Sequence, residues 1–411
     1  MKVIISPGAA DAADANLVQL RRKPAATPPI SPLFETLIEK FFVLGALFGL
    51  IGGVVIGAHL WLMLNGRVAV APSFTTLRAL HALMQTYLFF GLFILGFLFQ
   101  TAPKILKVHV RTSPMFLGTI PILILGIALE LQAPGAGIGR WLIATPFAAT
   151  FAYFASLTLR GTKAFRENYA WWVLLSLGGL TISPFFPVLS PEHAQIFVWF
   201  GVAPVTFAAG QQFIFAFLGG TRLAPGKNRF LFAFYLAALS LLFAANLNGG
   251  DTLWQGAGAM CGTCIVLFVI WTNSLRAMRR AYFDPLAFGF VSGYAWALTG
   301  CGALAFFGSA LIDSSFHLLT LGWLTPLIIA ISSQVLRAIS GKFWLPPKAV
   351  MTLLVVWQLV PIGRGLRAVL PIPPWFSLVV ITAAGLVLSL WLIAVARSAV
   401  RIMRKKAGAS T

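Results

Sequence analysis

Four of the five histidines in this sequence fall near one end of four separate apolar segments. His59, His81, His193 and His317 lie within such segments, whereas His109 falls in a basic stretch between two of them. Imidazole is a common ligand for metal ions and haem iron, and a shared site needs donors at one level on several helices. These histidines indicate a metal or haem site. The alternative interpretation is that each histidine is simply exposed to water at the end of its helix.

Three of these histidines recur at a regular spacing along the chain. They fall in the second, sixth and tenth apolar segments, and a glutamine follows each of them after 17 to 19 residues. The glutamines are Gln100, Gln211 with Gln212, and Gln334. This spacing favours a weak threefold repeat of four-helix units, with His81, His193 and His317 around a common axis. Chance recurrence is the alternative.

Three further polar residues could serve a group bound at these histidines. Gln85 lies four residues after His81, so both side chains share one helical face, where the amide could orient a ligand. Arg364 and Arg367 are candidates for haem propionates or another anion. The alternatives are an interhelical contact for Gln85 and snorkelling to lipid phosphate for the arginines.

The three cysteines offer a second kind of donor. Cys261 and Cys264 form a CxxC pair, and Cys301 falls in the following apolar segment. Thiolates at this spacing, with a third from a neighbouring helix, could hold Cu(I). The alternative to a metal site is that these small residues only allow the helices to pack closely. The sequence contains no CxxCH, which excludes a covalently attached c-type haem.

Composition identifies the solvent in which these residues must be positioned. The 411 residues are 59% hydrophobic and only 10% charged, with a mean hydropathy of +0.89. One water-soluble core cannot bury that much apolar surface, so we expect an all-α polytopic protein in a lipid bilayer. The net charge is +20, but the basic residues are scattered between apolar segments instead of gathering on one soluble face, which disfavours a nucleic-acid partner.

Twelve apolar segments are long enough to cross a membrane as helices. They cover residues 33–65, 76–103, 114–132, 140–160, 169–189, 192–219, 228–248, 253–275, 286–308, 313–339, 347–370 and 374–400. We expect a disordered cytoplasmic tail over 1–31, a transmembrane helical domain over 32–400 and a basic cytoplasmic tail over 401–411.

The basic residues test this count, because Lys and Arg concentrate on the cytoplasmic side of membrane proteins. All but five of the 30 Lys and Arg residues fall on one side of the predicted topology, which places both termini in the cytoplasm. The five on the outer side are Arg67, Arg78, Arg140, Arg364 and Arg367. The same topology places His59, His81, His193 and His317 toward the outer face.

Several segments resemble the NnrS family of twelve-helix membrane proteins associated with haem, copper and nitric oxide stress. The stretch from His81 through Gly96-Phe97-Leu98 to Thr101-Ala102-Pro103 is similar to the second helix of that family. The stretch His317-Leu-Leu-Thr-Leu-Gly322, leading to Arg337, resembles its tenth helix, and the stretch from His193 to Gly220 is similar to the central region of some members.

The resemblance implies a bacterial inner-membrane protein that binds haem b, with copper as a second candidate cofactor and nitric oxide as a candidate ligand. It links the chain to nitrosative stress or denitrification. This sequence departs from the family's HxHE pattern, because Leu83 and Met84 stand where the second histidine and the acid belong, and Ser340-Gly341-Lys342 carries no histidine. The implied ligands are therefore His81 and His317, with His193 as a third.

The histidines of the second and tenth segments also resemble the low-spin haem ligands in the catalytic subunit of haem–copper oxidases. The seventh segment has no histidine, so a copper and high-spin haem centre for oxygen reduction is not expected.

Two further function classes stay open. A small-solute transporter or channel could line a polar path with Gln100, Gln211, Gln212 and Gln334. Glu130, Glu192 and Asp313 fall near segment ends rather than at mid-membrane depth, which disfavours an ion-coupled transporter. A metal-free accessory protein of a respiratory complex is the third class.

Overall fold

The computed structural model of this protein describes residues 32–64, 66–70, 72–106, 115–134, 136–160, 169–371 and 373–407. Within these residues the chain forms helices and no strand, which confirms the predicted all-α fold. The tail expected over 1–31 lies outside the described residues. At the other end the last helix continues to Ala407, seven residues beyond the end predicted for it.

A helix occupies each of the twelve predicted segments. The first four segments consist of α2 (Pro32–Phe48), η1 (Gly49–Ile56) and α3 (Gly57–Leu64); α4 (Phe74–Leu83), η2 (Met84–Phe90) and α5 (Gly91–Leu106); α6 (Met115–Gln132); and α7 (Ile138–Arg160). The next four consist of α9 (Trp171–Ile182) and η4 (Ser183–Phe185); α10 (Pro191–Gln195), η5 (Ile196–Val202) and α11 (Ala203–Phe217); α12 (Pro225–Asn248); and α13 (Asp251–Trp271).

The last four segments consist of α15 (Pro285–Phe307); α16 (Ile312–His317), η8 (Leu318–Leu324) and α17 (Thr325–Ser340); α18 (Pro347–Trp357) and α19 (Leu359–Val369); and α20 (Pro374–Ala407). Short connectors are formed by η6 (Ser274–Ala277), α14 (Met278–Ala281) and η7 (Gly308–Leu311).

Length and apolar composition support the reading of these helices as membrane spans. In the described part of the chain, nine stretches are long and apolar enough to cross a membrane, and one of them, Pro285–Ile339, contains both the ninth and the tenth segments. The third and fifth segments are the shorter apolar helices Gly118–Gln132 and Trp171–Phe185. The chain is therefore a polytopic membrane protein.

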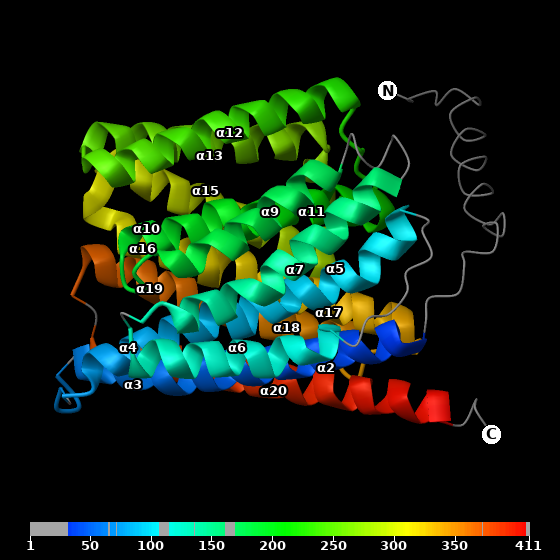
Figure 1. Cartoon of the computed structure of the whole chain (residues 1–411), viewed down its shortest axis with the longest axis horizontal. Helices are drawn as coiled ribbons and strands as arrows, with labels where there is room; N and C mark the ends of the chain where they lie inside the picture. Colours follow the sequence, from blue (N-terminus) through cyan, green and yellow to red (C-terminus); the bar gives the residue numbers. More distant parts are fainter. Residues whose placement is uncertain are drawn as a thin grey trace, which may run out of the picture.

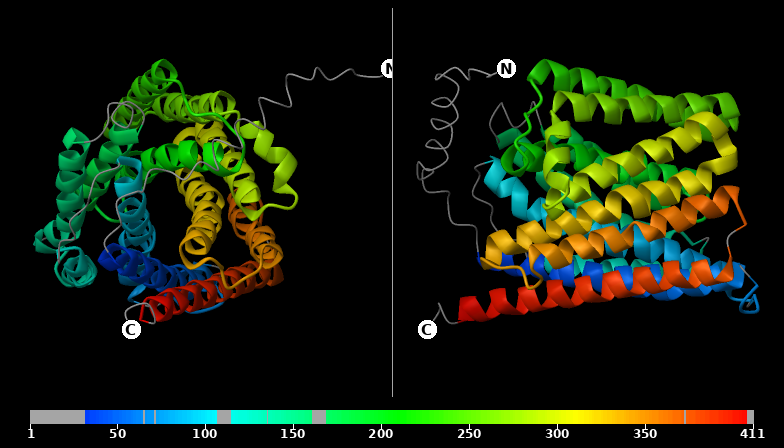
Figure 2. Two further views of the ribbon diagram at one scale, coloured as in Figure 1. Left: turned by 90° about the vertical axis from the view of Figure 1, so that its right-hand side faces the viewer. Right: turned by 180° about the vertical axis from the view of Figure 1, so that it is seen from behind.

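The segments run side by side along the long axis of the molecule (Figure 1). Helix α2 begins and α20 ends at the same end of the bundle, as an even number of crossings requires. The histidine-bearing helices α3, α4, α10 and α16 lie at the opposite end, together with α19 (Figures 1 and 2). The structure thus brings the four predicted outer histidines to one end of the molecule.

Three segments change from α to π hydrogen bonding shortly after a histidine. The π-helices η2, η5 and η8 have seven residues each and begin within three residues of His81, His193 and His317. In each, a bulky aromatic stands six residues after the histidine and is fully buried; these are Tyr87, Trp199 and Trp323. This shared geometry in the second, sixth and tenth segments supports the predicted threefold repeat.

Glycines let the first and second segments approach closely. A Cβ at Gly49 would lie 2.7 Å from the ring of Phe89, and one at Gly52 would lie 2.6 Å from the Cβ of Met84. Small residues at such contacts are how membrane helices gain packing, because lipid supplies no hydrophobic force between them. The two segments therefore meet along η1 and η2. Gln85 lies in η2, and His81 lies in α4, three residues before η2 begins.

A second close contact joins α9 to η5. A Cβ at Gly179 would lie 2.3 Å from the carbonyl carbon of Phe200, which is backbone and cannot move aside. The hydroxyl of Ser176 donates a hydrogen bond to the carbonyl of Gly201 at the same crossing. The neighbouring Gly178 has only one atom near its Cβ position, 3.9 Å away on Phe151.

We expect the substitution Gly179→Ala to destabilise the protein by about 2 kcal/mol or more, because overpacking here forces α9 away from η5. Gly178→Ala is the matched control and should be neutral or slightly stabilising, because alanine favours a helix over glycine. Thermal melting in detergent measures both. Equal melting temperatures for the two variants would contradict the close α9–η5 crossing.

Candidate functional site

His81 lies against the glycine-rich face of the first segment. Its Nδ1 is 2.6 Å from the carbonyl oxygen of Gly52, and a Cβ at Gly57 would lie 2.9 Å from its Cε1. A carbonyl only accepts hydrogen bonds, so Nδ1 carries the proton and Nε2 keeps its lone pair. A histidine held in this way is oriented to offer Nε2 to a metal.

His317 is held in the same tautomer on α16. Its Nδ1 lies 2.7 Å from the carbonyl oxygen of Asp313, one turn earlier in the helix, and 3.5 Å from a carboxylate oxygen of that residue. The proton therefore sits on Nδ1 and the lone pair on Nε2, as in His81. His81 and His317 lie within electrostatic range of each other, and both lie within range of Arg364.

Arg364 joins the tenth and eleventh segments at this point. Its guanidinium donates a hydrogen bond of 2.8 Å to Asp313 and lies 3.3 and 3.4 Å from the two ring nitrogens of His317. One nitrogen of the Arg364 guanidinium thus lies within hydrogen-bonding distance of Nε2 of His317, which can accept a hydrogen bond from it. Arg364 and Arg367 also lie over the ring of Trp61 in α3, at 5.5 and 5.3 Å from its centre.

These residues form one group at the histidine-bearing end of the bundle, which we call the outer cluster after the side predicted for it. It contains Trp61, Arg78, His81, Asp313, His317, Arg364 and Arg367. Asp313 interacts electrostatically with all three arginines and is the one carboxylate in the group. One nitrogen of Arg367 is buried without a hydrogen-bond partner. The outer cluster therefore has positive charge to spare for an anionic group.

His193 is not part of the outer cluster. Its Nε2 lies 2.9 Å from the hydroxyl of Tyr87, which in turn lies 2.9 Å from the hydroxyl of Ser183. The Nε2 atom that would bind a metal is thus engaged by a protein group. The expected meeting of three histidines around one axis is not formed, because Tyr87 of the second segment binds His193 instead.

The other predicted ligands do not join the outer cluster. His59 is exposed on α3, and Cys261, Cys264 and Cys301 are free and buried where α13 packs on α15. Across the part of the chain that the structure describes, no three His, Cys, Asp or Glu side chains gather to hold a metal ion.

The predicted glutamines differ in their surroundings. Gln211 is buried and donates a hydrogen bond of 3.2 Å to Asn228, whereas Gln212 and Gln334 are half-buried, and the side chain of Gln100 lies outside the described residues. Gln85 fills the space beside Gly53, within 3.5 Å of the carbonyl oxygen of Phe48. It shares the face of His81, as its spacing predicted.

Comparison with known proteins bears on this arrangement. A family model described as NnrS protein matches residues 40–406. The chain belongs to the NnrS family. A comparison with curated proteins found no match. The NnrS match spans every segment that contributes to the outer cluster, from α3 to α19, so the cluster lies within the family domain rather than on an added element.

Four residues around these sites were not predicted from the sequence of this NnrS protein. Asp313 had a signal, since it stands one helical turn before His317. Tyr87 stands six residues after His81, but a lone tyrosine in an apolar segment gives no hint of its partner. Trp61 and Arg78 could not be identified, because only the folded bundle brings the first and second segments to the eleventh.

The donors of the outer cluster fit haem. Haem iron takes axial ligands from histidine Nε2 atoms, and His81 and His317 both keep that nitrogen unprotonated. Haem propionates are carboxylates, which arginine binds through paired N–H groups. The remaining capacity of Arg367 suits such a partner.

We expect Tyr87→Phe to lower the stability of the protein by about 0.5–1.5 kcal/mol, because it leaves His193 and Ser183 without a shared partner inside the bundle. Tyr153→Phe is the control, since the buried Tyr153 hydroxyl has no hydrogen-bond partner. Thermal melting of both variants in detergent measures the difference. A melting temperature for Tyr87→Phe at or above that of Tyr153→Phe would refute a structural role for this hydrogen bond.

Proposed function

We propose that this NnrS-family protein binds haem b through His81 and His317 and acts in the response of the bacterial inner membrane to nitric oxide or in denitrification. The observation that carries the proposal is the common state of the two histidines. Each donates its Nδ1 proton to a backbone carbonyl, at 2.6 and 2.7 Å, and so has an unprotonated Nε2. At His317 this Nε2 lies 3.4 Å from Arg364, so haem binding through it requires the guanidinium to turn away. Bound haem would supply an iron atom for nitric oxide binding or electron transfer.

The arginines support the same proposal. Arg364 and Arg367 come from α19 and lie over Trp61, which restricts their motion toward lipid. Asp313 occupies part of the capacity of Arg364 through the 2.8 Å hydrogen bond. In our proposal Arg367 binds one propionate. Arg364 turns away from Nε2 of His317 and binds the second propionate with the hydrogen-bonding capacity that Asp313 leaves.

Copper has less support than haem. A copper site built on three donors needs a third ligand beside His81 and His317, and His193 is engaged by Tyr87. The transport alternative also has less support, because Gln211, one of the glutamines that would line the path, is hydrogen-bonded to Asn228 inside the bundle.

We expect purified wild-type protein to show a haem Soret band that is lost or shifted in His81→Ala and in His317→Ala. His59→Ala is the matched control, because this exposed histidine lies at the same end of the bundle outside the outer cluster, and it should leave the spectrum unchanged. Oxidised and reduced absorption spectra, with iron counted by elemental analysis, measure the effect. Wild-type protein that contains neither haem nor iron after expression with haem supplied would overturn the proposal.

A further inference from the structure

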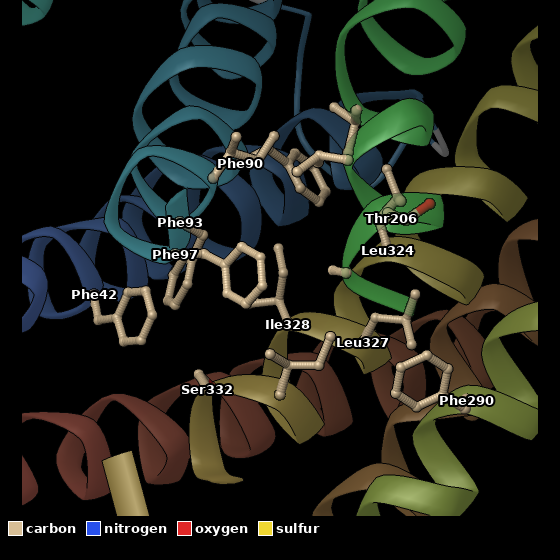
Figure 3. Close-up of a pocket in the computed structure, with 15 residues that line it drawn as sticks. Phe42, Phe90, Phe93, Phe97, Thr206, Phe290, Leu324, Leu327, Ile328 and Ser332 are labelled. Atoms are coloured by element: carbon tan, nitrogen blue, oxygen red, sulfur yellow. The ribbon is translucent and has the colours of Figure 1, made fainter. Parts of the chain in front are cut away.

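An apolar cavity lies where the three central π-helices end. The last residues of η2, η5 and η8, which are Phe90, Val202 and Leu324, all line it. Figure 3 shows their neighbours Phe93, Leu327 and others turned toward one common space from several helices. The cavity has a volume of about 70 Å³. It therefore lies where the second, sixth and tenth segments meet inside the bundle.

The wall of this cavity offers little to water. Its lining is apolar except for Thr206 and Ser332. The hydroxyl of Thr206 donates to the carbonyl of Ala203 at 2.7 Å, and that of Ser332 donates to the carbonyl of Ile329 at 3.2 Å. No lining side chain keeps a hydrogen-bond donor for an occupant. A water molecule needs two to four polar partners, so the cavity favours an apolar occupant.

The size of the cavity restricts the occupant further. An engineered apolar cavity of about 150 Å³ admits benzene or xenon, and a space about half as large suits a single atom or a diatomic molecule. Access does not require the bundle to unfold, because Phe97, Ile328 and Ile331 on the wall are half-buried rather than sealed from the surface.

The π-helices indicate that the cavity is more than a packing defect. π-Helical turns are rare and occur often at functional sites, because they widen the helix and interrupt the regular packing of side chains. Here three of them, at equivalent places in three segments, end at the same space. Just before that point the segments pack tightly, with the rings of Trp199 and Trp323 6.1 Å apart.

We propose that this cavity is a binding site for a small apolar molecule of the size of a diatomic gas. The site is separate from the outer cluster, and the proposal holds whether or not haem is bound there. Nitric oxide and dioxygen belong to this chemical class. Xenon, which is apolar and of similar size, is the probe.

The test uses crystals of the full-length protein pressurised with xenon, and an anomalous difference map locates the gas. We expect a xenon peak among Phe90, Val202 and Leu324 in the wild type. Ala209→Leu adds volume to the cavity wall and should remove the peak. Ala259→Leu is the matched control, because Ala259 is exposed on α13, and it should keep the peak.

A second variant tests the proposal even if the Ala209→Leu protein does not fold. Leu327→Ala enlarges the same cavity and should raise xenon occupancy above that of the wild type. Absence of xenon from the wild-type cavity, or unchanged occupancy in Leu327→Ala, would overturn the proposal. Density for a lipid or detergent chain, or for ordered water, in this space would also overturn it, since each identifies a different occupant.

Discussion

Lipid offers no hydrogen bonds to a polypeptide backbone, so every N–H and C=O group in this bundle has to find its partner within the chain. In the described part of the chain, η1, η2, η5 and η8 meet that requirement with π rather than α hydrogen bonds, and the last three each follow a histidine. The change of register determines which side chains face the centre. It buries Tyr87, Trp199 and Trp323 completely, and each stands six residues after a histidine.

The outer ends of these three segments depart from that common plan. His81 and His317 both donate Nδ1 protons to backbone carbonyls and keep Nε2, whereas His193 is bound by the hydroxyl of Tyr87. The first segment adds to this difference between the histidines, because its glycines leave room for His81 to pack against it. The repeated architecture thus produces one pair of similar histidines and one histidine that joins two segments.

The sequence predicted the parts of this arrangement that depend on composition and spacing. Apolar runs predicted the twelve segments, and the regular spacing of His81, His193 and His317 predicted that the second, sixth and tenth segments are related. The sequence could not predict the π-helices in those segments, because residues such as Met84 to Phe90 have the composition of an ordinary α-helix. The bond between Tyr87 and His193 joins residues 106 positions apart, and no local pattern encodes such a contact.

The central claim is that His81 and His317 offer Nε2 to one shared group. Electron paramagnetic resonance of the haem-loaded protein, prepared with ¹⁵N-labelled histidine, tests it most directly through the nitrogens coupled to the iron. We expect two coupled imidazole nitrogens in the wild type, with one lost in His81→Ala and the other in His317→Ala. A coupled histidine nitrogen that survives removal of both residues would contradict the claim, because the iron would then be held elsewhere in the chain.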